Sequence, residues 1–202
     1  EAFGVSAPNP RSARPDTTPS TTHVGYLQTS SEYHQKRLLA AGVGDNYTLA
    51  SVFRADEQGR LHNPGFTMLE WYRLGFDDRA LMAEVSELVD LLLGAETYRT
   101  HRYSELLDSV ELSADERRDI AEADQNDLRL ARAVESLGAG RHFVIDYPAD
   151  AAVLARLDPM DSSIARRFEL VVDGVEIANG YFELTEVSVH RERFEQDNRV
   201  RS

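Results

Sequence analysis

The sequence predicts an α+β fold, in which antiparallel strands alternate with helices. Two apolar segments, Tyr47–Arg54 and Phe66–Tyr72, flank a polar loop, as expected of an antiparallel hairpin with a long connection. A second pair, Arg167–Val172 and Val175–Leu184, flanks Asp173–Gly174, a dipeptide favoured in tight hairpin turns. The intervening segments have helical periodicity, so helices should cover the strands.

The N-terminal elements follow from composition and spacing. Glu1–Thr22 contains four of the seven prolines, which predicts an irregular segment that is mobile without ligand. Glu32–Ala41 has the spacing of a helix. Its expected buried face consists of Tyr33, Leu38 and Leu39.

The remaining helices have recognisable starts. Asp77–Leu93 should be an amphipathic helix with Asp77 or Asp78 as its N-cap. Its expected apolar stripe is Leu81, Val85, Leu88 and Leu92. Ser113–Leu137 begins with a capping-box pattern and is expected to form one helical region. A short strand, His142–Tyr147, should stop at Pro148, and a charged helix should follow over Val187–Arg199.

Composition narrows the class of protein. The 202 residues, 42% of them hydrophobic, are enough for a single domain over residues 1–202 with a sizeable core. No apolar run approaches the roughly 20 residues of a membrane span. The absence of cysteine excludes disulfides and thiolate metal sites, which favours a cytoplasmic enzyme. A net charge of −13 argues against a broad phosphate-binding surface, and favours a basic protein partner over whole tRNA.

The first hairpin carries residue types suited to gripping a nucleotide. Arg54 can form a planar fork onto a phosphate or carboxylate. His62 on the loop could contact distal phosphates, and Phe66 could stack on the purine. The alternative is an ordinary hairpin with a polar loop and a core phenylalanine.

The second hairpin carries acids that could hold a cation. Glu169 and Glu176 lie on adjacent predicted strands, and two carboxylates near phosphates suit Mg²⁺. Asn179, Tyr181 and Glu183 alternate, so all three should project from one strand face as a pocket for a cationic amine. The alternative is a solvated face of an acidic protein.

Five segments, in this order, carry a resemblance to one family: SSEYHQKRLLAAG, FRADEQGRLHNPGFTMLEWYR, RRFEL, GVEIANGYFELTE and RFEQDNR. From about Tyr26 to Arg201 the chain resembles the elongation factor P–(R)-β-lysine ligases, which are short relatives of class II lysyl-tRNA synthetases. The resemblance implies a class II synthetase-like antiparallel sheet flanked by helices. It also implies activation of lysine or β-lysine by ATP, through an aminoacyl-adenylate, and transfer to a lysine of elongation factor P.

The resemblance also implies residue roles. Arg54 would bind the α-phosphate and the substrate carboxylate, as the catalytic residue. The ATP-binding set would be Arg54, Asp56, His62 and Phe66. The amino-acid-binding set would be Glu32, Glu70, Tyr72, Asn179, Tyr181 and Glu183, with Glu183 pairing the distal ammonium. Glu169 and Glu176 would hold Mg²⁺, and the family is compatible with a homodimer.

The chain departs from the family pattern at a few positions. Ala55-Asp56 stands where Asn-Glu is usual, Gly65 replaces a glutamate, Ser31 replaces a proline, and Tyr181 replaces the commoner phenylalanine. The first and last family motifs are also missing, so the chain is expected to be truncated at both ends. Two alternatives to the ligase follow: a lysyl-tRNA synthetase catalytic fragment, and a non-catalytic paralogue that binds an amino acid or nucleotide.

Overall fold

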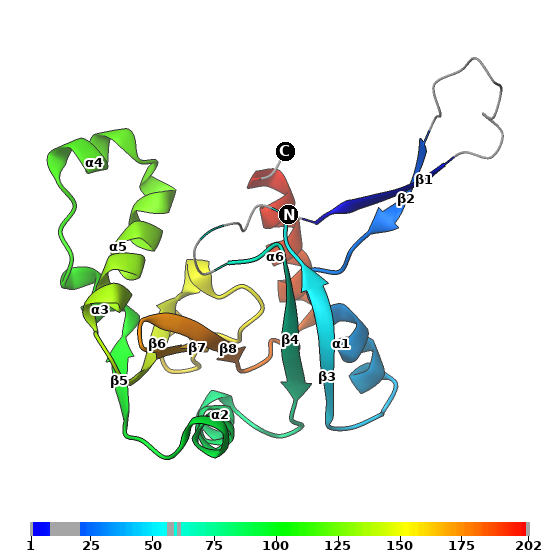
Figure 1. Ribbon diagram of the computed structural model, residues 1–202, viewed down its shortest axis with the longest axis horizontal. Coiled ribbons are helices and arrows are strands. Elements are labelled where there is room, and N and C mark those ends of the chain that lie inside the picture. Colours follow the sequence, from blue (N-terminus) through cyan, green and yellow to red (C-terminus); the bar gives the residue numbers. More distant parts are fainter. Residues whose placement is uncertain (1, 9–20, 56–58, 60–61, 201–202) are drawn as a thin grey trace. The chain divides into compact units, whose positions relative to one another are not determined.

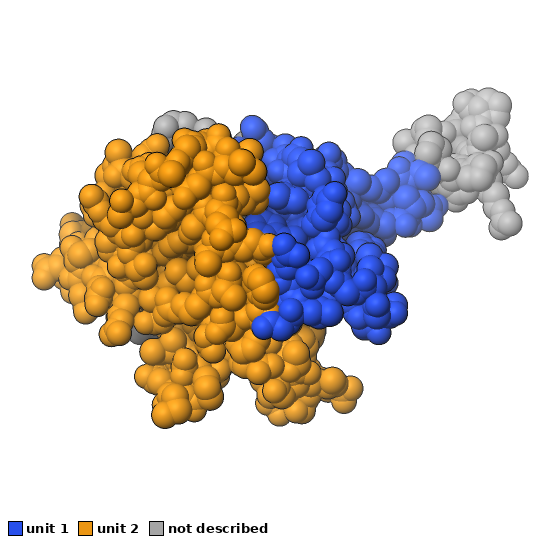
Figure 2. Space-filling model, turned by 90° about the horizontal axis from the view of Figure 1, so that it is seen from below, with its two compact units in different colours: residues 1–75 blue, residues 76–202 orange. Residues whose placement is uncertain are grey.

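The computed structural model describes residues 2–8, 21–55, 59 and 62–200 (Figure 1). The chain divides into two compact units, Glu1–Gly75 and Phe76–Ser202, which are coloured separately in Figure 2. Each unit contains helices and antiparallel strands, so the predicted α+β class is confirmed. The single domain expected over the whole chain stays a prediction.

The first unit begins with a two-stranded ribbon that the sequence did not suggest. Strand β1 (Gly4–Pro8) pairs antiparallel with β2 (Thr21–Tyr26). The prediction of an irregular segment is therefore wrong for residues 4–8 and 21–22, while residues 9–20 lie outside the described part. The prolines misled the prediction, because Pro8 sits in the last pair of the ribbon, where a strand tolerates a missing N–H.

The predicted hairpin forms next, with one face of mixed apolar and acidic character. Strands β3 (Asn46–Phe53) and β4 (Gly65–Tyr72) pair antiparallel along their full lengths. Side chains on a strand alternate between its faces. Phe66, Glu70 and Tyr72 therefore share one face of β4.

Helix α1 (Glu32–Ala40) forms where predicted but buries a different face. Tyr33 is 62% exposed and Leu38 is also exposed, so their predicted burial is wrong, whereas Gln35 is only 1% exposed. Hydrogen bonds explain why this face is buried. Gln35 donates to Ser31, and Ser31 donates to Glu70 on β4. Directional hydrogen bonds, rather than apolar periodicity, orient this helix.

The second unit is organised around a four-stranded sheet. Its strands lie in the order β5 (Tyr98–Arg102), β6 (Arg141–Pro148), β7 (Ile164–Val172) and β8 (Val175–Tyr181). Strand β5 runs parallel to β6, and the other neighbours are antiparallel. The predicted hairpin turn is confirmed, because Asp173 and Gly174 both have positive φ, at 51° and 80°. The polar β5 has no alternating pattern and was missed.

Helix α2 (Asp78–Leu93) contacts β7 and β8, and its rotation differs from the prediction. Val85 is buried as expected, but Leu92 is 71% exposed. The buried positions are instead Asp78, Met82, Val85 and Val89. These lie on one face of the helix, which begins at the buried Asp78 carboxylate.

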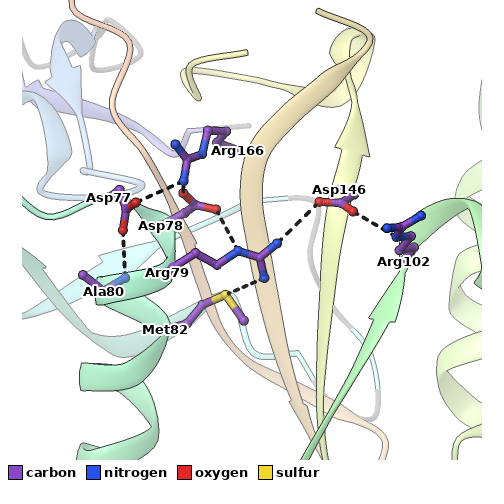
Figure 3. A network of polar contacts seen from close by, with 8 residues as sticks. All are labelled: Asp77, Asp78, Arg79, Ala80, Met82, Arg102, Asp146 and Arg166. Carbon is purple, nitrogen blue, oxygen red and sulfur yellow. Dashed lines mark hydrogen bonds and ion pairs between the residues drawn. The ribbon is translucent and has the colours of Figure 1, made fainter. Parts of the chain in front are cut away.

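A polar network explains that rotation (Figure 3). Arg166 on β7 bridges Asp77 at 3.1 Å and Asp78 at 2.5 Å, while Asp77 caps α2 by accepting from the Ala80 N–H. Arg79 and Arg102 both pair with Asp146, at 3.8 and 3.3 Å. The network joins the start of α2 to β5, β6 and β7, and so fixes which helix face meets the sheet.

Helices α3 (Tyr103–Asp108) and α5 (Glu122–Ser136) contribute to the core of this unit. The short α3 packs with α5. The core here includes Tyr103, Ala133, Val144, Tyr147 and Val171. A 3₁₀ turn, η2 (Ala149–Ala151), follows β6. Helix α6 (Val187–Val200) has nearly the same bounds as the predicted terminal helix. None of the helices in the described part has the length and apolar character needed to cross a membrane.

The helical region expected over 113–137 is interrupted. Helix α4 (Ala114–Asp119) ends at Ile120, whose backbone is extended, and α5 starts again at Glu122. The Gln125 side chain donates to the carbonyl groups of Arg117 and Ile120, which stabilises the break. The predicted capping box at Ser113 is confirmed.

The start of α4 yields a pH prediction. Glu116 accepts from Arg132 at 2.5 Å and from the Ser113 N–H at 2.9 Å, which lowers its pKa from 4.5 to about 2. A carboxylate with a depressed folded-state pKa stabilises the protein fully above its unfolded value, and loses this contribution as pH falls toward the folded value. The extra stability of the native protein over Glu116→Gln should therefore shrink between pH 4.5 and about 2.

Urea unfolding at successive pH values measures this difference. Asp115→Asn is a matched control, because this neighbouring acid is exposed and pairs with Arg118 on the helix surface. A gap between native protein and Glu116→Gln that stays constant over the acidic range would contradict the assignment.

Candidate functional site

Arg54 directly follows strand β3, at the loop end of the β3–β4 hairpin. Its N–H donates to the Pro64 carbonyl at 2.9 Å, and its Nε donates to the Thr29 carbonyl at 3.3 Å. Its guanidinium carbon lies 5.4 Å from the centre of the Phe66 ring, within the range of a cation–π contact. The two residues predicted to contact phosphate and purine are thus adjacent.

The hairpin loop is only partly described. Asp56 lies outside the described residues, so its role in ATP binding stays a prediction. His62 is exposed, and its N–H donates to the Gly59 carbonyl at 3.4 Å. Its role at the distal phosphates stays a prediction.

Glu70 is the centre of a hydrogen-bonded cluster. One carboxylate oxygen, Oε1, accepts from Ser30 Oγ at 2.8 Å. The other, Oε2, accepts from both the N–H and the hydroxyl of Ser31, each at 2.6 Å. Gln35 Nε2 donates in turn to Ser31 Oγ at 2.9 Å. The cluster ties the start of α1 to the middle of β4.

Glu32 and Tyr72 occupy neighbouring positions in the same unit. The Glu32 N–H donates to Ser30 Oγ, and its carboxylate pairs with Lys36 at 2.6 Å, one helical turn later. Tyr72 is half-buried at the end of the hairpin, opposite Asn46. Glu32, Glu70 and Tyr72 therefore sit on adjoining elements.

In the second unit, β7 and β8 place the predicted acids on one face. Glu169 lies opposite Asn179, whose Nδ2 donates to Glu169 Oε1 at 3.3 Å. Because of a register shift after Leu170, Glu176 lies opposite Val171. Val171 is two residues from Glu169, so both acids belong to the same face of the sheet.

Arg167 was not singled out in the sequence, yet it is the main partner of Glu169. Its Nη2 lies 2.5 Å from Glu169 Oε1, and both side chains are largely buried. Nη1 donates to the Ala151 carbonyl at 2.9 Å, and the guanidinium lies 4.4 Å from the Tyr147 ring centre. The sequence did contain a signal for this ion pair, because a basic residue two positions before an acid on one strand lies on the same face as that acid.

Tyr147 lies beside this ion pair. It is 2% exposed, and burial, followed by the nearby Glu169 charge, raises its pKa well above the ordinary value. Its buried hydroxyl is close to Glu169 but makes no hydrogen bond of good geometry within the described part. The hydroxyl is therefore neutral and remains a donor at physiological pH.

The alternation predicted for Asn179, Tyr181 and Glu183 holds only in part. Strand β8 ends at Tyr181, which lies opposite Arg167. Glu183 falls past the strand, in an isolated bridge to Ala155, so its place on the strand face is wrong. Just past the strand, the Phe182 N–H donates to the Arg166 carbonyl, and the Phe182 carbonyl accepts from the Arg156 N–H.

The carboxylates of the second unit suit Mg²⁺ in chemistry but do not complete a site alone. Glu169 and Glu176 supply the oxygen ligands that this ion prefers. Within the described residues, no group of three or more histidine, cysteine, aspartate or glutamate side chains could hold a metal ion. A bound Mg²⁺ would therefore take its other ligands from water or phosphate oxygens, as it commonly does.

Comparison with known proteins matches the sequence of this chain to one family. Residues 5–201 match the model of class II tRNA synthetases (D, K and N). The chain is 42% identical to the elongation factor P–(R)-β-lysine ligase of Edwardsiella ictaluri (strain 93-146), in an alignment covering 88% of this chain and 61% of the relative.

Two further relatives have the same name. The chain is 41% identical to the protein of Vibrio vulnificus (strain YJ016), with 87% of this chain and 61% of the relative aligned. It is 40% identical to that of Klebsiella pneumoniae (strain 342), with 88% and 61% aligned. The chain thus spans about 61% of the length of these relatives.

Proposed function

Because the chain belongs to the class II tRNA synthetases (D, K and N), we propose that it carries much of the active site of an ATP-dependent ligase. The substrate would be lysine or β-lysine, and the acceptor a lysine side chain of elongation factor P. The observation that carries the proposal is the placement of Arg54 against Phe66 at the loop end of a hairpin that also bears Glu70. This activity would place the protein in the cytoplasm.

The reaction has two transfers and needs no covalent enzyme nucleophile. First, a carboxylate oxygen of the amino acid attacks the α-phosphorus of ATP, an O–P bond forms, and pyrophosphate leaves. Next, the acceptor amine attacks the carbonyl carbon of the adenylate, losing a proton as an amide forms and AMP leaves. The enzyme contributes orientation and charge stabilisation in both steps.

The chain supplies groups for each part of the substrates. Arg54 would neutralise charge at the α-phosphate and the amino-acid carboxylate, because its guanidinium can contact two oxygens at once. Phe66 would stack on the purine of ATP. Asp56 would contact the same adenine base, and His62 would contact the distal phosphates. Mg²⁺, held by Glu169 and Glu176, would shield the phosphates.

The remaining predicted residues would recognise the amino acid. Glu32 and Glu70 would receive the α- or β-amino group, since carboxylates form charge-assisted hydrogen bonds with an ammonium. The resemblance also implies contacts with the lysine side chain for Tyr72 in the first unit, and for Asn179, Tyr181 and Glu183 in the second. Glu183 would pair with the distal ammonium.

ATP–pyrophosphate exchange with the full-length protein tests the first transfer. Exchange should depend on lysine or β-lysine and be absent with leucine as the control amino acid. Lysine binding by calorimetry without any exchange would contradict the enzyme and support a non-catalytic paralogue.

Acceptor choice is tested separately with labelled amino acid. Label should pass to elongation factor P, and a variant of that protein lacking the acceptor lysine should stay unlabelled. Transfer to tRNA instead would contradict the proposed acceptor and identify a lysyl-tRNA synthetase activity.

A further inference from the structure

Ser31 gives this chain hydrogen bonds that a proline at the same position could not make. It donates both its N–H and its hydroxyl to Glu70 Oε2, each at 2.6 Å. Proline has no N–H and no side-chain donor.

These bonds occupy most of the acceptor capacity of Glu70. A carboxylate offers about four lone-pair directions, two on each oxygen. In the part of the chain that the structure describes, Ser31 fills both on Oε2, and Ser30 fills one on Oε1. An ammonium group brings three donors but would find one open direction on Oε1.

The surroundings hold Ser31 in this arrangement. Ser31 is 5% exposed and Gln35 is 1% exposed, so water competes poorly for either side chain. Gln35 Nε2 donates to Ser31 Oγ at 2.9 Å, which leaves the hydroxyl hydrogen directed to Glu70. The donor set is thus built into the start of α1 and does not depend on a substrate.

We propose that Ser31 competes with the substrate amino group for Glu70 and thereby weakens amino-acid binding. The inference rests on the proposed function, in which Glu70 receives that amino group. Ser31 acts through Glu70 and contacts no reacting atom, so it should affect affinity for lysine much more than the rate of adenylate formation.

Two variants of the full-length protein separate the donors. Ser31→Ala removes the hydroxyl and keeps the N–H, whereas Ser31→Pro removes both. The φ of Ser31, −89°, is near the proline range, and Ser31→Ala covers the case in which the proline variant does not fold. Ser51→Ala, on the exposed face of β3, is the matched control.

Lysine affinity is the decisive measurement. By calorimetry, Ser31→Ala should lower the Kd for lysine by about 3-fold and Ser31→Pro by about 10-fold, on the scale of hydrogen bonds to a charged group. KM for lysine in pyrophosphate exchange should fall in parallel, with kcat changed less than about 2-fold. Ser51→Ala should match the native protein. Unchanged or weaker lysine binding by folded Ser31 variants would overturn the inference.

Amide hydrogen exchange gives a second readout. The Ser31 N–H should exchange slowly in the free protein, and faster when lysine takes over Glu70. If neither native protein nor variants bind lysine, the proposed function fails and this inference with it. If all bind lysine equally well and the Ser31 N–H stays protected, the inference alone is wrong.

Discussion

Replacing Arg54 with alanine should lower kcat/KM for lysine-dependent ATP–pyrophosphate exchange by about 10²- to 10³-fold. Adenylate formation brings two anions together, and charge concentrates where the carboxylate meets the α-phosphate. Arg54 is the cation at the loop end of the hairpin, held by hydrogen bonds to Pro64 and Thr29 and by the Phe66 ring. Removing it takes away a preorganised donor pair that water replaces poorly.

Arg54→Lys should retain part of the activity, with a loss of about 10-fold, because lysine keeps the charge but lacks the planar fork. Arg118→Ala is the matched control: this arginine is 70% exposed and pairs with Asp115 and Asp119 on the surface of α4. Equal losses in Arg54→Ala and Arg118→Ala, or full activity in Arg54→Ala, would contradict the role of Arg54.

Local signals explain what the sequence could predict of the fold. The Asp173–Gly174 turn and the alternating segments around it are properties of short stretches, and both hairpins form at the expected positions. The rotation of a helix about its axis could not be predicted in this way, because it depends on contacts with residues far away in the sequence. The buried face of α2 depends on Asp78 meeting Arg166, which lies 88 residues later in the chain and carries no periodic signal.

The same distinction applies to the candidate site. Arg54 and Phe66 come together through hairpin register, which local pattern predicts. The residues that donate hydrogen bonds to the acids of the site could not be predicted from local pattern. Ser31 reaches Glu70 across 39 positions, and a serine at a helix start suggests only a cap. Polar contacts between segments depend on exact placement, which residue type alone does not determine.

Replacing Gly180 with alanine should lower the free energy of unfolding by about 1–3 kcal/mol, as overpacking a core does. A Cβ at this position would lie 2.4 Å from Phe168 Cζ and 2.7 Å from Cε1. Phe168 is fully buried opposite Gly180 and packs edge-on against Phe143, so its rigid ring has little room to move. The strand must shift instead, and with it the neighbouring Asn179 and Tyr181.

Urea denaturation of Gly180→Ala and of the double variant Gly180→Ala/Phe168→Leu identifies the cause. If the ring causes the loss, a smaller side chain at 168 should relieve the clash, so the double variant should be more stable than the sum of the single effects. Gly25→Ala is the control, since a Cβ there meets no atom within 4 Å. Strict additivity of the two substitutions would show that the close approach to Phe168 is not what requires glycine in β8.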